Sequence, residues 1–130
     1  IVGNHSDKHP CFPEVSIERR EQEVLNVHQY MLDNYNYTMT LFRAPAGEFS
    51  EQTLAQTQEL GYKTVFWSYA YKDWDPNNQM GPENALPKIT KALHPGAIYL
   101  LHAVSPDNAA ILGDFIDNAR EAGYNFALFQ

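Results

Sequence analysis

Strand-like apolar runs and helical patterns alternate along this chain of 130 residues, and the alternation limits its fold more than any other feature. Strands that are joined by helical crossovers pair in parallel, with the helices packed outside the sheet. We therefore expect an α/β fold that forms one domain at most. Polar groups at the carboxyl ends of its strands would then share one rim, where such folds place their chemistry.

The expected strands are short and apolar. They cover Ile1 to His5, Thr40 to Arg43, Lys63 to Ser68, Gly96 to His102 and Tyr124 to Phe129. The expected helices run from Ser16 to about Asn34, from Ser50 to Leu60, from about Glu83 to Leu93, and from Ser105 to about Gly123. Serines are favourable caps at helix starts, and glycine commonly follows a helix end. His5, Arg43, Asp73 and His102 fall at or just after strand ends, which predicts that they lie on one rim.

Composition excludes several classes of function. A net charge of −7, with only nine Lys and Arg, argues against the nucleic-acid backbone or an anionic membrane as a partner. No apolar run approaches the roughly 20 residues that cross a bilayer. Eight Tyr, seven Phe and two Trp would suit a groove that stacks on sugar rings, although core packing is the commoner use of aromatics. Cys11 is the only cysteine, so no internal disulfide forms.

A histidine pair provides the clearest chemical signal. His5 and His9 are four residues apart, and two imidazoles at this spacing can bind zinc, cobalt, nickel or iron. Helical zinc proteases place Glu directly after the first His, but Ser6 stands there, and Pro10 disfavours helical dihedrals at His9. The pair is therefore interpreted as a loop clamp. Catalytic zinc sites usually have three protein ligands, so two histidines do not complete one.

Four short motifs occur in order along the chain. They are His5-Ser6-x-x-His9-Pro10, Arg43 before the turn of Pro45 and Gly47, Asp73-Trp74, and Leu100-Leu101-His102. In this order they resemble the NodB-homology polysaccharide deacetylases, carbohydrate esterase family 4. The stretches from Val65 to Trp74 and from His94 to His102, together with Asn77-Asn78-Gln79, resemble more closely the muramic-acid deacetylases that prepare the δ-lactam of the spore cortex.

The resemblance implies a fold and a place within it. The family's fold is a distorted (β/α) barrel, and residues 1–130 would be the C-terminal part of a single polysaccharide deacetylase domain that lacks its first strands. The family's first motif, Thr-Phe-Asp-Asp, supplies the general base and the third metal ligand, and this sequence contains no such segment. We therefore expect this fragment alone to be inactive. Its open sheet edge would pair with the missing N-terminal portion or with a second copy of the chain.

The resemblance also implies catalytic roles. His5 and His9 would bind one divalent metal, for which zinc is expected and cobalt, nickel or iron are alternatives. His102 would be the general acid, and Asp73 would orient this imidazole and favour its protonated form. Arg43 would pair with the missing base. Taken alone, each of these residues is also compatible with a structural role, such as a loop histidine or a turn cap.

Four further positions would contact the substrate. The backbone N–H of Ala46, which follows Pro45, is the expected oxyanion donor. Trp74 would line the sugar groove, and it is equally compatible with a core position. Leu101 completes this set.

The expected activity is the metal-dependent hydrolysis of the N-acetyl group of N-acetylmuramic acid in peptidoglycan. A deacetylase of N-acetylglucosamine or of another glycan is an alternative in the same class. An inactive proteolytic or swapped fragment that binds metal or glycan without turnover is an alternative in another class. The glycan substrate implies a location outside the cytoplasmic membrane, in the cell envelope or the forespore wall.

Overall fold

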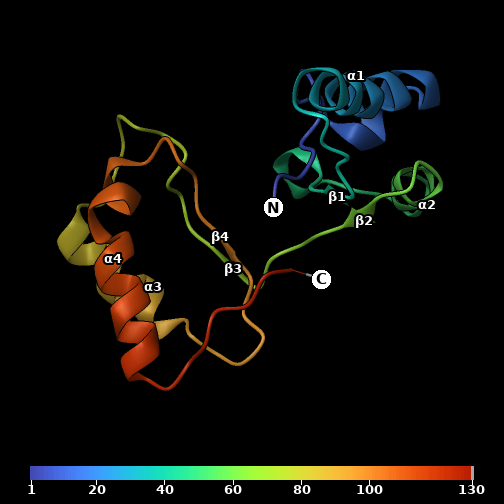
Figure 1. Cartoon of the computed structure of the whole chain (residues 1–130). Coiled ribbons are helices and arrows are strands. Elements are labelled where there is room, and N and C mark those ends of the chain that lie inside the picture. The colour runs from blue at the N-terminus through green and yellow to red at the C-terminus, as the bar shows by residue number, and fades with distance from the viewer. Residues whose placement is uncertain (130) are drawn as a thin grey trace. The chain divides into compact units, whose positions relative to one another are not determined.

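The chain divides at Phe66 in the computed structural model, which describes residues 1–129 (Figure 1). The first unit covers Ile1–Phe66, and the second begins at Trp67. Each unit has its own hydrophobic core and its own pair of parallel strands. The parallel pairing in both units agrees with the α/β fold that the alternation of strands and helices predicts.

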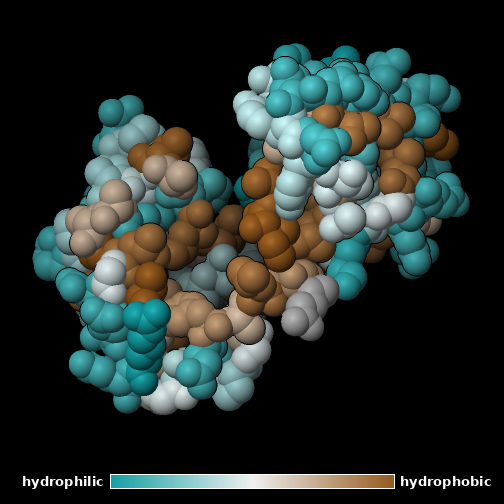
Figure 2. Space-filling model, viewed as in Figure 1, coloured by the Kyte–Doolittle hydropathy of each residue, from teal (hydrophilic) through white to brown (hydrophobic). Residues whose placement is uncertain are grey.

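Helix α1 (Ile17–Tyr35) is the longest element of the first unit. Ser16 caps it, because the serine side chain accepts a hydrogen bond from the Arg19 N–H. The helix ends at Asn36, whose left-handed backbone (φ 48°) lets its N–H reach the last carbonyls of the helix. Its exposed surface is mostly hydrophilic in Figure 2.

Strands β1 (Leu41–Phe42) and β2 (Lys63–Thr64) form the parallel pair of this unit, with Leu41 opposite Lys63. Asn4 extends the pairing by a parallel bridge to Phe42. Helix α2 (Glu51–Glu59) begins with a capping box of Ser50 and Thr53. The short 3-10 turns η1 (Phe12–Glu14) and η2 (Pro45–Gly47) complete the unit. Its core consists of Phe12, Val24, Met39, Phe42, Ala44 and Tyr62.

The second unit packs two helices against each other beside one strand pair (Figure 1). Strands β3 (Tyr69–Ala70) and β4 (Tyr99–Leu100) are parallel, and helices α3 (Pro82–Lys91) and α4 (Pro106–Glu121) follow them along the chain. Ser105 caps α4 by accepting the Asn108 N–H, and Pro106 occupies its first turn. The core consists of Tyr71, Ala85, Ile89, Ile111 and Phe115.

All four expected helices form within about two residues of their predicted bounds. The strands are shorter than predicted, and two predictions were wrong. The segment from Ile1 to His5 contributes only the bridge at Asn4, and residues 124–129 form no strand. A strand is defined by its hydrogen-bonded partner, and residues 124–129 pair with no strand in the part of the chain that the structure describes.

Within residues 1–129, no helix combines the length and the apolar character that spanning a bilayer requires.

The core of the second unit should depend on Ile89, which is fully buried between α3 and its neighbours. We expect Ile89→Ala to lower the free energy of unfolding by ~2–5 kcal/mol, because it leaves a cavity as well as removing buried methyl groups. The matched control is Leu112→Ala on α4, where the side chain is about half exposed and the loss should be below ~1 kcal/mol. Urea unfolding followed by circular dichroism measures both, and equal losses would contradict the assigned core.

Candidate functional site

His5 directly follows Asn4, the residue that bridges to β1. The His5 Nδ1 atom lies 2.7 Å from the backbone carbonyl oxygen of Arg43. A carbonyl oxygen can only accept, so Nδ1 carries the hydrogen and Nε2 is the acceptor nitrogen of the neutral ring. Metal-binding histidines typically show this arrangement, in which a carbonyl fixes the ring through one nitrogen while the other faces the metal.

The sequence prediction that His5 and His9 form a pair agrees with their geometry. Their ring centroids are 4.9 Å apart, and the two planes are nearly perpendicular. Ser6 and His9 both have left-handed backbone angles (φ 67° and 55°), which residues other than glycine rarely adopt. The Ser6 hydroxyl accepts the His9 N–H at 3.0 Å, a bond that helps to hold this strained loop.

Asn4 anchors the start of this loop, and sequence reasoning missed it. Its side chain is 1% exposed, and its Nδ2 donates to the Val24 carbonyl at 2.9 Å and to the Tyr62 hydroxyl at 3.2 Å. Its Oδ1 accepts the Ser6 N–H at 2.9 Å. The signal available in the sequence was an amide side chain directly before a predicted metal ligand. An amide that is buried must find hydrogen-bond partners, and here the loop provides one of them.

The donor set of the loop fits part of a zinc-type site. Two imidazoles, one of them oriented by a backbone carbonyl through its Nδ1, are ligands that zinc accepts. Among residues 1–129, no group of three or more His, Cys, Asp and Glu side chains lies close enough to hold a metal ion. The histidine pair therefore supplies two of the protein ligands that a catalytic site usually requires.

Arg43 and the turn after it lie in the same unit as the histidines. The Arg43 N–H donates to the Asn4 carbonyl at 2.9 Å, and its guanidinium is half-buried, which lowers its pKa. It forms no ion pair within the described residues. Its partial exposure leaves the guanidinium in contact with water, and the predicted pairing of Arg43 with a base stays a prediction.

The turn at Pro45 and Ala46 presents a backbone N–H as predicted, although its role stays a prediction. Pro45 is buried, whereas Ala46 is exposed with a left-handed backbone (φ 53°). The Gly47 N–H donates to the Ala44 carbonyl and the Glu48 N–H to that of Pro45, so these bonds close the turn without using the Ala46 N–H.

Asp73 and His102 meet in the second unit, as the sequence predicts. Asp73 is fully buried, and its Oδ1 lies 2.6 Å from His102 Nδ1. Its Oδ2 accepts the His102 backbone N–H at 2.6 Å. Since an ionised carboxylate only accepts, Nδ1 carries the hydrogen and the half-buried ring is oriented through this nitrogen.

Asn108 completes the setting of the Asp73 carboxylate. Its Nδ2 donates to Asp73 Oδ2 at 2.6 Å and to the His102 carbonyl at 3.1 Å. Burial acts to raise the pKa of the Asp73 carboxyl, but the hydrogen bonds from His102 and Asn108 outweigh it and bring that pKa below its ordinary value. Asp73 is therefore ionised at neutral pH.

A second layer of polar side chains holds Asn108. Sequence reasoning assigned no role to Asn108. The Tyr71 hydroxyl donates to Asn108 Oδ1 at 2.5 Å, and Ser105 Oγ accepts the Asn108 N–H. Ser105 Oγ in turn donates to Gln79, whose amide also donates to the Asp73 carbonyl. The available signal was Asn108 itself, an amide in the first turn of an amphipathic helix.

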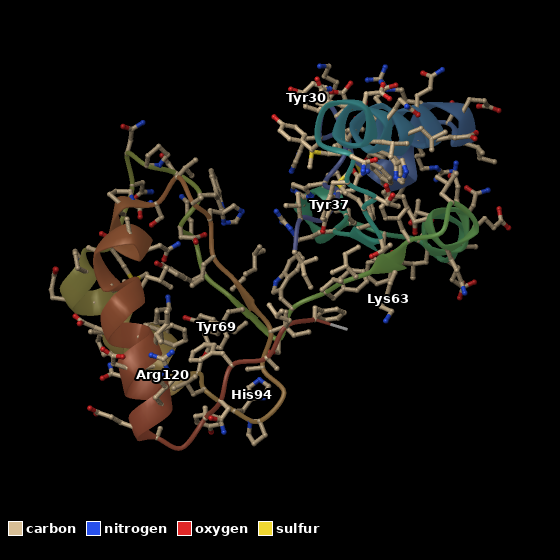
Figure 3. The ribbon with its side chains drawn as sticks, in the orientation of Figure 1. Tyr30, Tyr37, Lys63, Tyr69, His94 and Arg120 are labelled. Atoms are coloured by element: carbon tan, nitrogen blue, oxygen red, sulfur yellow. The ribbon has the colours of Figure 1, made fainter. Side chains whose placement is uncertain are left out.

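The predicted substrate-contacting residues of this unit differ in exposure. Trp74 is 56% exposed, so the alternative of a core position was wrong, and the Lys72 ammonium lies 5.2 Å from its ring centroid. Leu101 is half-buried and packs against the core of the second unit. Tyr69, labelled in Figure 3, packs against Tyr99 in the same core, with ring centroids 5.0 Å apart and the planes tilted by 47°.

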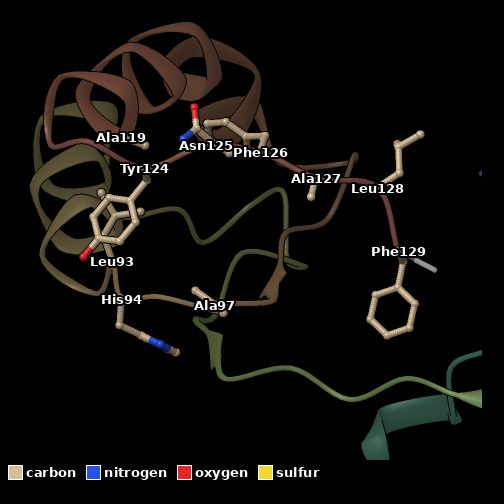
Figure 4. A pocket seen from close by; sticks show the side chains of 11 residues that line it. Leu93, His94, Ala97, Ala119, Tyr124, Asn125, Phe126, Ala127, Leu128 and Phe129 are labelled. Carbon is tan, nitrogen blue, oxygen red and sulfur yellow. The ribbon is translucent and has the colours of Figure 1, made fainter.

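A mostly apolar hollow of about 380 Å³ lies elsewhere in this unit (Figure 4). Leu93, His94 and the segment 124–129 line it, and none of the predicted site residues does. His94 Nε2 lies 3.0 Å from the Ser68 hydroxyl, and Ser68 Oγ also accepts the Ile98 N–H. These bonds tie two loops that sequence reasoning singled out for their resemblance.

The structure thus assembles the predicted residues as two local groups. His5, His9, Arg43, Pro45 and Ala46 lie in the first unit, and Asp73, Trp74, Leu101 and His102 lie in the second. The prediction that both groups share one rim stays a prediction.

The family profile described as polysaccharide deacetylase matches residues 1–65, which is half of the chain. The chain is 44% identical over 128 residues to the peptidoglycan-N-acetylmuramic acid deacetylase PdaA of Bacillus subtilis. That alignment covers 97% of this chain and 48% of PdaA. The chain is also 27% identical to the peptidoglycan-N-acetylglucosamine deacetylase PgdA of Listeria monocytogenes, over 96% of this chain and 26% of PgdA.

Solved structures of family 4 carbohydrate esterases resemble the fold. That of Bacillus subtilis PdaA has a TM-score of 0.91, with 97% of this chain and 54% of PdaA covered. A CE4 family pseudoenzyme from Bacillus anthracis has a TM-score of 0.87 at 25% identity, with 95% of this chain and 43% of that chain covered. The chain therefore has the predicted α/β fold, and it spans about half the length of PdaA and about a quarter of PgdA.

The hydrogen bonds to Asp73 should make the stability of the second unit depend on pH. The pKa of this carboxyl is lower in the folded state, so its contribution is present above the unfolded value of about 3.9 and is lost as pH falls through the folded value. We expect Asp73→Asn to cost ~2 kcal/mol or more at pH 7 and progressively less in acid. Urea midpoints measured from pH 7 to pH 3 test this.

The matched control for this experiment is Asp114→Asn, at an exposed position of α4. Its urea midpoint should follow the unmodified protein at every pH. A constant difference between Asp73→Asn and the unmodified protein across the pH range would show that the charge of Asp73 does not stabilise the fold.

Proposed function

This chain belongs to the polysaccharide deacetylase family, and from that premise we propose that it carries part of the active site of a peptidoglycan de-N-acetylase. The reaction hydrolyses the N-acetyl amide of an amino sugar and releases acetate. It requires a polarised acetyl carbonyl, an attacking water, a base and an acid for the leaving amine.

The Asp73–His102 pair is the observation that carries this proposal. His102 Nδ1 donates to Asp73 Oδ1, with 2.6 Å between the two atoms, which leaves Nε2 as the atom that can deliver a proton. An imidazolium beside a buried carboxylate is suited to protonate the leaving amine as the C–N bond breaks. Asn108, whose own N–H is held by Ser105, holds Asp73 in place, so the ring keeps one orientation during that transfer.

His5 and His9 are proposed as metal ligands. A divalent metal bound there would polarise the acetyl carbonyl and activate a water, and zinc is the expected ion, with cobalt, nickel or iron as alternatives. A carboxylate from outside this stretch of 130 residues would add the third ligand, and another would act as the base that Arg43 holds ionised. A further segment of the same domain would supply both carboxylates, because this sequence contains no Asp-Asp motif of its own.

The proposed substrate is N-acetylmuramic acid in a peptidoglycan strand, by analogy with PdaA. The Ala46 N–H after Pro45 would stabilise the developing oxyanion, and Trp74 and Leu101 would contact the sugar. Lys72, which lies against Trp74, could meet the lactyl carboxylate that distinguishes muramic acid. N-acetylglucosamine is the alternative within the family, and its support is the similarity to PgdA. Either substrate would place the protein outside the cytoplasmic membrane, in the cell envelope or forespore wall.

A binding protein without turnover is the second candidate. The CE4 family pseudoenzyme from Bacillus anthracis resembles this chain with a TM-score of 0.87. Such a protein would keep the glycan contacts at Trp74 and release no acetate. Acetate release from peptidoglycan by the full-length protein, assayed with zinc and with cobalt, distinguishes the two candidates.

The metal and acid roles separate in a pair of substitutions. We expect His9→Ala to lower zinc affinity by at least about ten-fold, because it removes one of two nitrogen ligands. His102→Ala should bind zinc as the unmodified chain does but should lower acetate release by about 10²–10⁴-fold, the usual contribution of an acid. Isothermal titration of this chain with zinc measures the first effect. Acetate release by the full-length protein that carries the same substitution measures the second.

His94→Ala is the control for zinc binding, since His94 is exposed, lies in the second unit and contacts the Ser68 hydroxyl at 3.0 Å. Equal loss of zinc affinity in His9→Ala and His102→Ala would contradict the assigned roles. Acetate release that His102→Ala leaves unchanged would contradict the acid.

A further inference from the structure

We propose that Glu23, in helix α1, is a positioning residue that fixes the loop of His5 and His9 in the conformation that binds metal. The inference rests on the proposed function, because it concerns the same metal site. It assigns to helix α1 a role in the site, although the helix carries no ligand.

Glu23 joins helix α1 to the loop through its buried carboxylate. The residue is 1% exposed, and its Oε2 accepts the backbone N–H of Lys8 at 2.6 Å. Its Oε1 accepts two hydrogen bonds from the guanidinium of Arg19, one turn earlier, at 3.0 and 2.5 Å. Burial of a carboxylate is costly unless its oxygens are satisfied, and here the loop satisfies one of them.

The position of Lys8 gives this bond its effect on the site. Lys8 directly precedes His9, whose backbone is held at φ 55°. This angle is unfavourable for a residue with a side chain, and it persists only where surrounding contacts impose it. A bond that fixes the Lys8 N–H therefore helps to fix the direction in which the His9 imidazole leaves the chain.

The same helix holds a second point of the loop. Asn26 Nδ2 donates to Asp7 Oδ2 at 3.3 Å, about one turn beyond Glu23. The helix is itself anchored, because Val24 is fully buried in the core and Arg20 bonds to the Phe12 carbonyl and to Gln52. A loop tied to a fixed helix keeps its two ligands in place before the metal arrives, which raises metal affinity by removing the cost of ordering them.

A pair of near-isosteric substitutions tests the role. Glu23→Met keeps the size of the side chain and removes both acceptors, so we expect zinc affinity to fall by about 10- to 100-fold, as for other groups that orient metal ligands. Glu23→Gln keeps an oxygen that can accept the Lys8 N–H, and its affinity should stay within about three-fold of the unmodified chain. Titration with zinc alone, on the whole chain, gives each affinity.

Two controls separate positioning from general stability. Glu21→Met, at an exposed position of the same helix, should leave zinc affinity unchanged. Thermal unfolding without metal should show that Glu23→Met remains folded, and the visible spectrum of bound cobalt reports the ligand geometry directly. If Glu23→Met fails to fold, Glu23→Ala replaces it.

The outcomes distinguish this inference from the proposed function. Zinc affinity that falls in folded Glu23→Met and recovers in Glu23→Gln supports the positioning role. Unchanged affinity in Glu23→Met, while His9→Ala loses zinc, overturns the role of Glu23 and leaves the metal site intact. Absence of zinc binding by the unmodified chain overturns the metal site and this inference with it.

Discussion

The buried carboxylate of Asp73 is the interaction on which the candidate chemistry of the second unit depends. Both of its oxygens are engaged, by the His102 ring, the His102 backbone N–H and the Asn108 amide. A buried charge that lost these partners would be strongly destabilising. The segment after β4, through His102, and the first turn of α4, through Asn108, therefore meet at one acceptor. The histidine that would act as acid is held by groups that also stabilise the fold.

In the first unit, a buried neutral side chain, that of Asn4, joins several elements as Asp73 does in the second. The side-chain amide of Asn4 donates from Nδ2 to helix α1 and to Tyr62, and its Oδ1 accepts from the loop that begins with Ser6. The loop then tolerates two left-handed residues within four positions, Ser6 and His9. Strain of this kind is typical of functional loops, where neighbouring contacts impose a conformation that the backbone alone would avoid.

Sequence reasoning predicted what depends on local pattern. Helix bounds followed from caps such as Ser16 and Ser105, and the Asp73–His102 pair followed from the resemblance of short motifs. It could not predict the contacts of Glu23 or Asn108. A polar residue in an amphipathic helix is a candidate for such a role, but the sequence does not show which distant group it will meet, here the Lys8 N–H or the Asp73 carboxylate. The strand expected at 124–129 failed for a related reason, since strand formation depends on a partner and a segment's own alternation does not supply one.

The hydrogen bonds described above for each group of site residues join residues of the same unit. The bonds that orient His5 and His9 come from Asn4, Ser6, Glu23 and Arg43, and those that orient His102 come from Asp73 and Asn108. Substitutions that share no partners are usually additive in their effect on stability, whereas residues in one network are coupled. A substitution that disturbs the metal-binding loop should therefore leave the orientation of His102 unchanged, and the reverse should also hold. A complete hydrolysis would nevertheless require both metal binding and proton delivery.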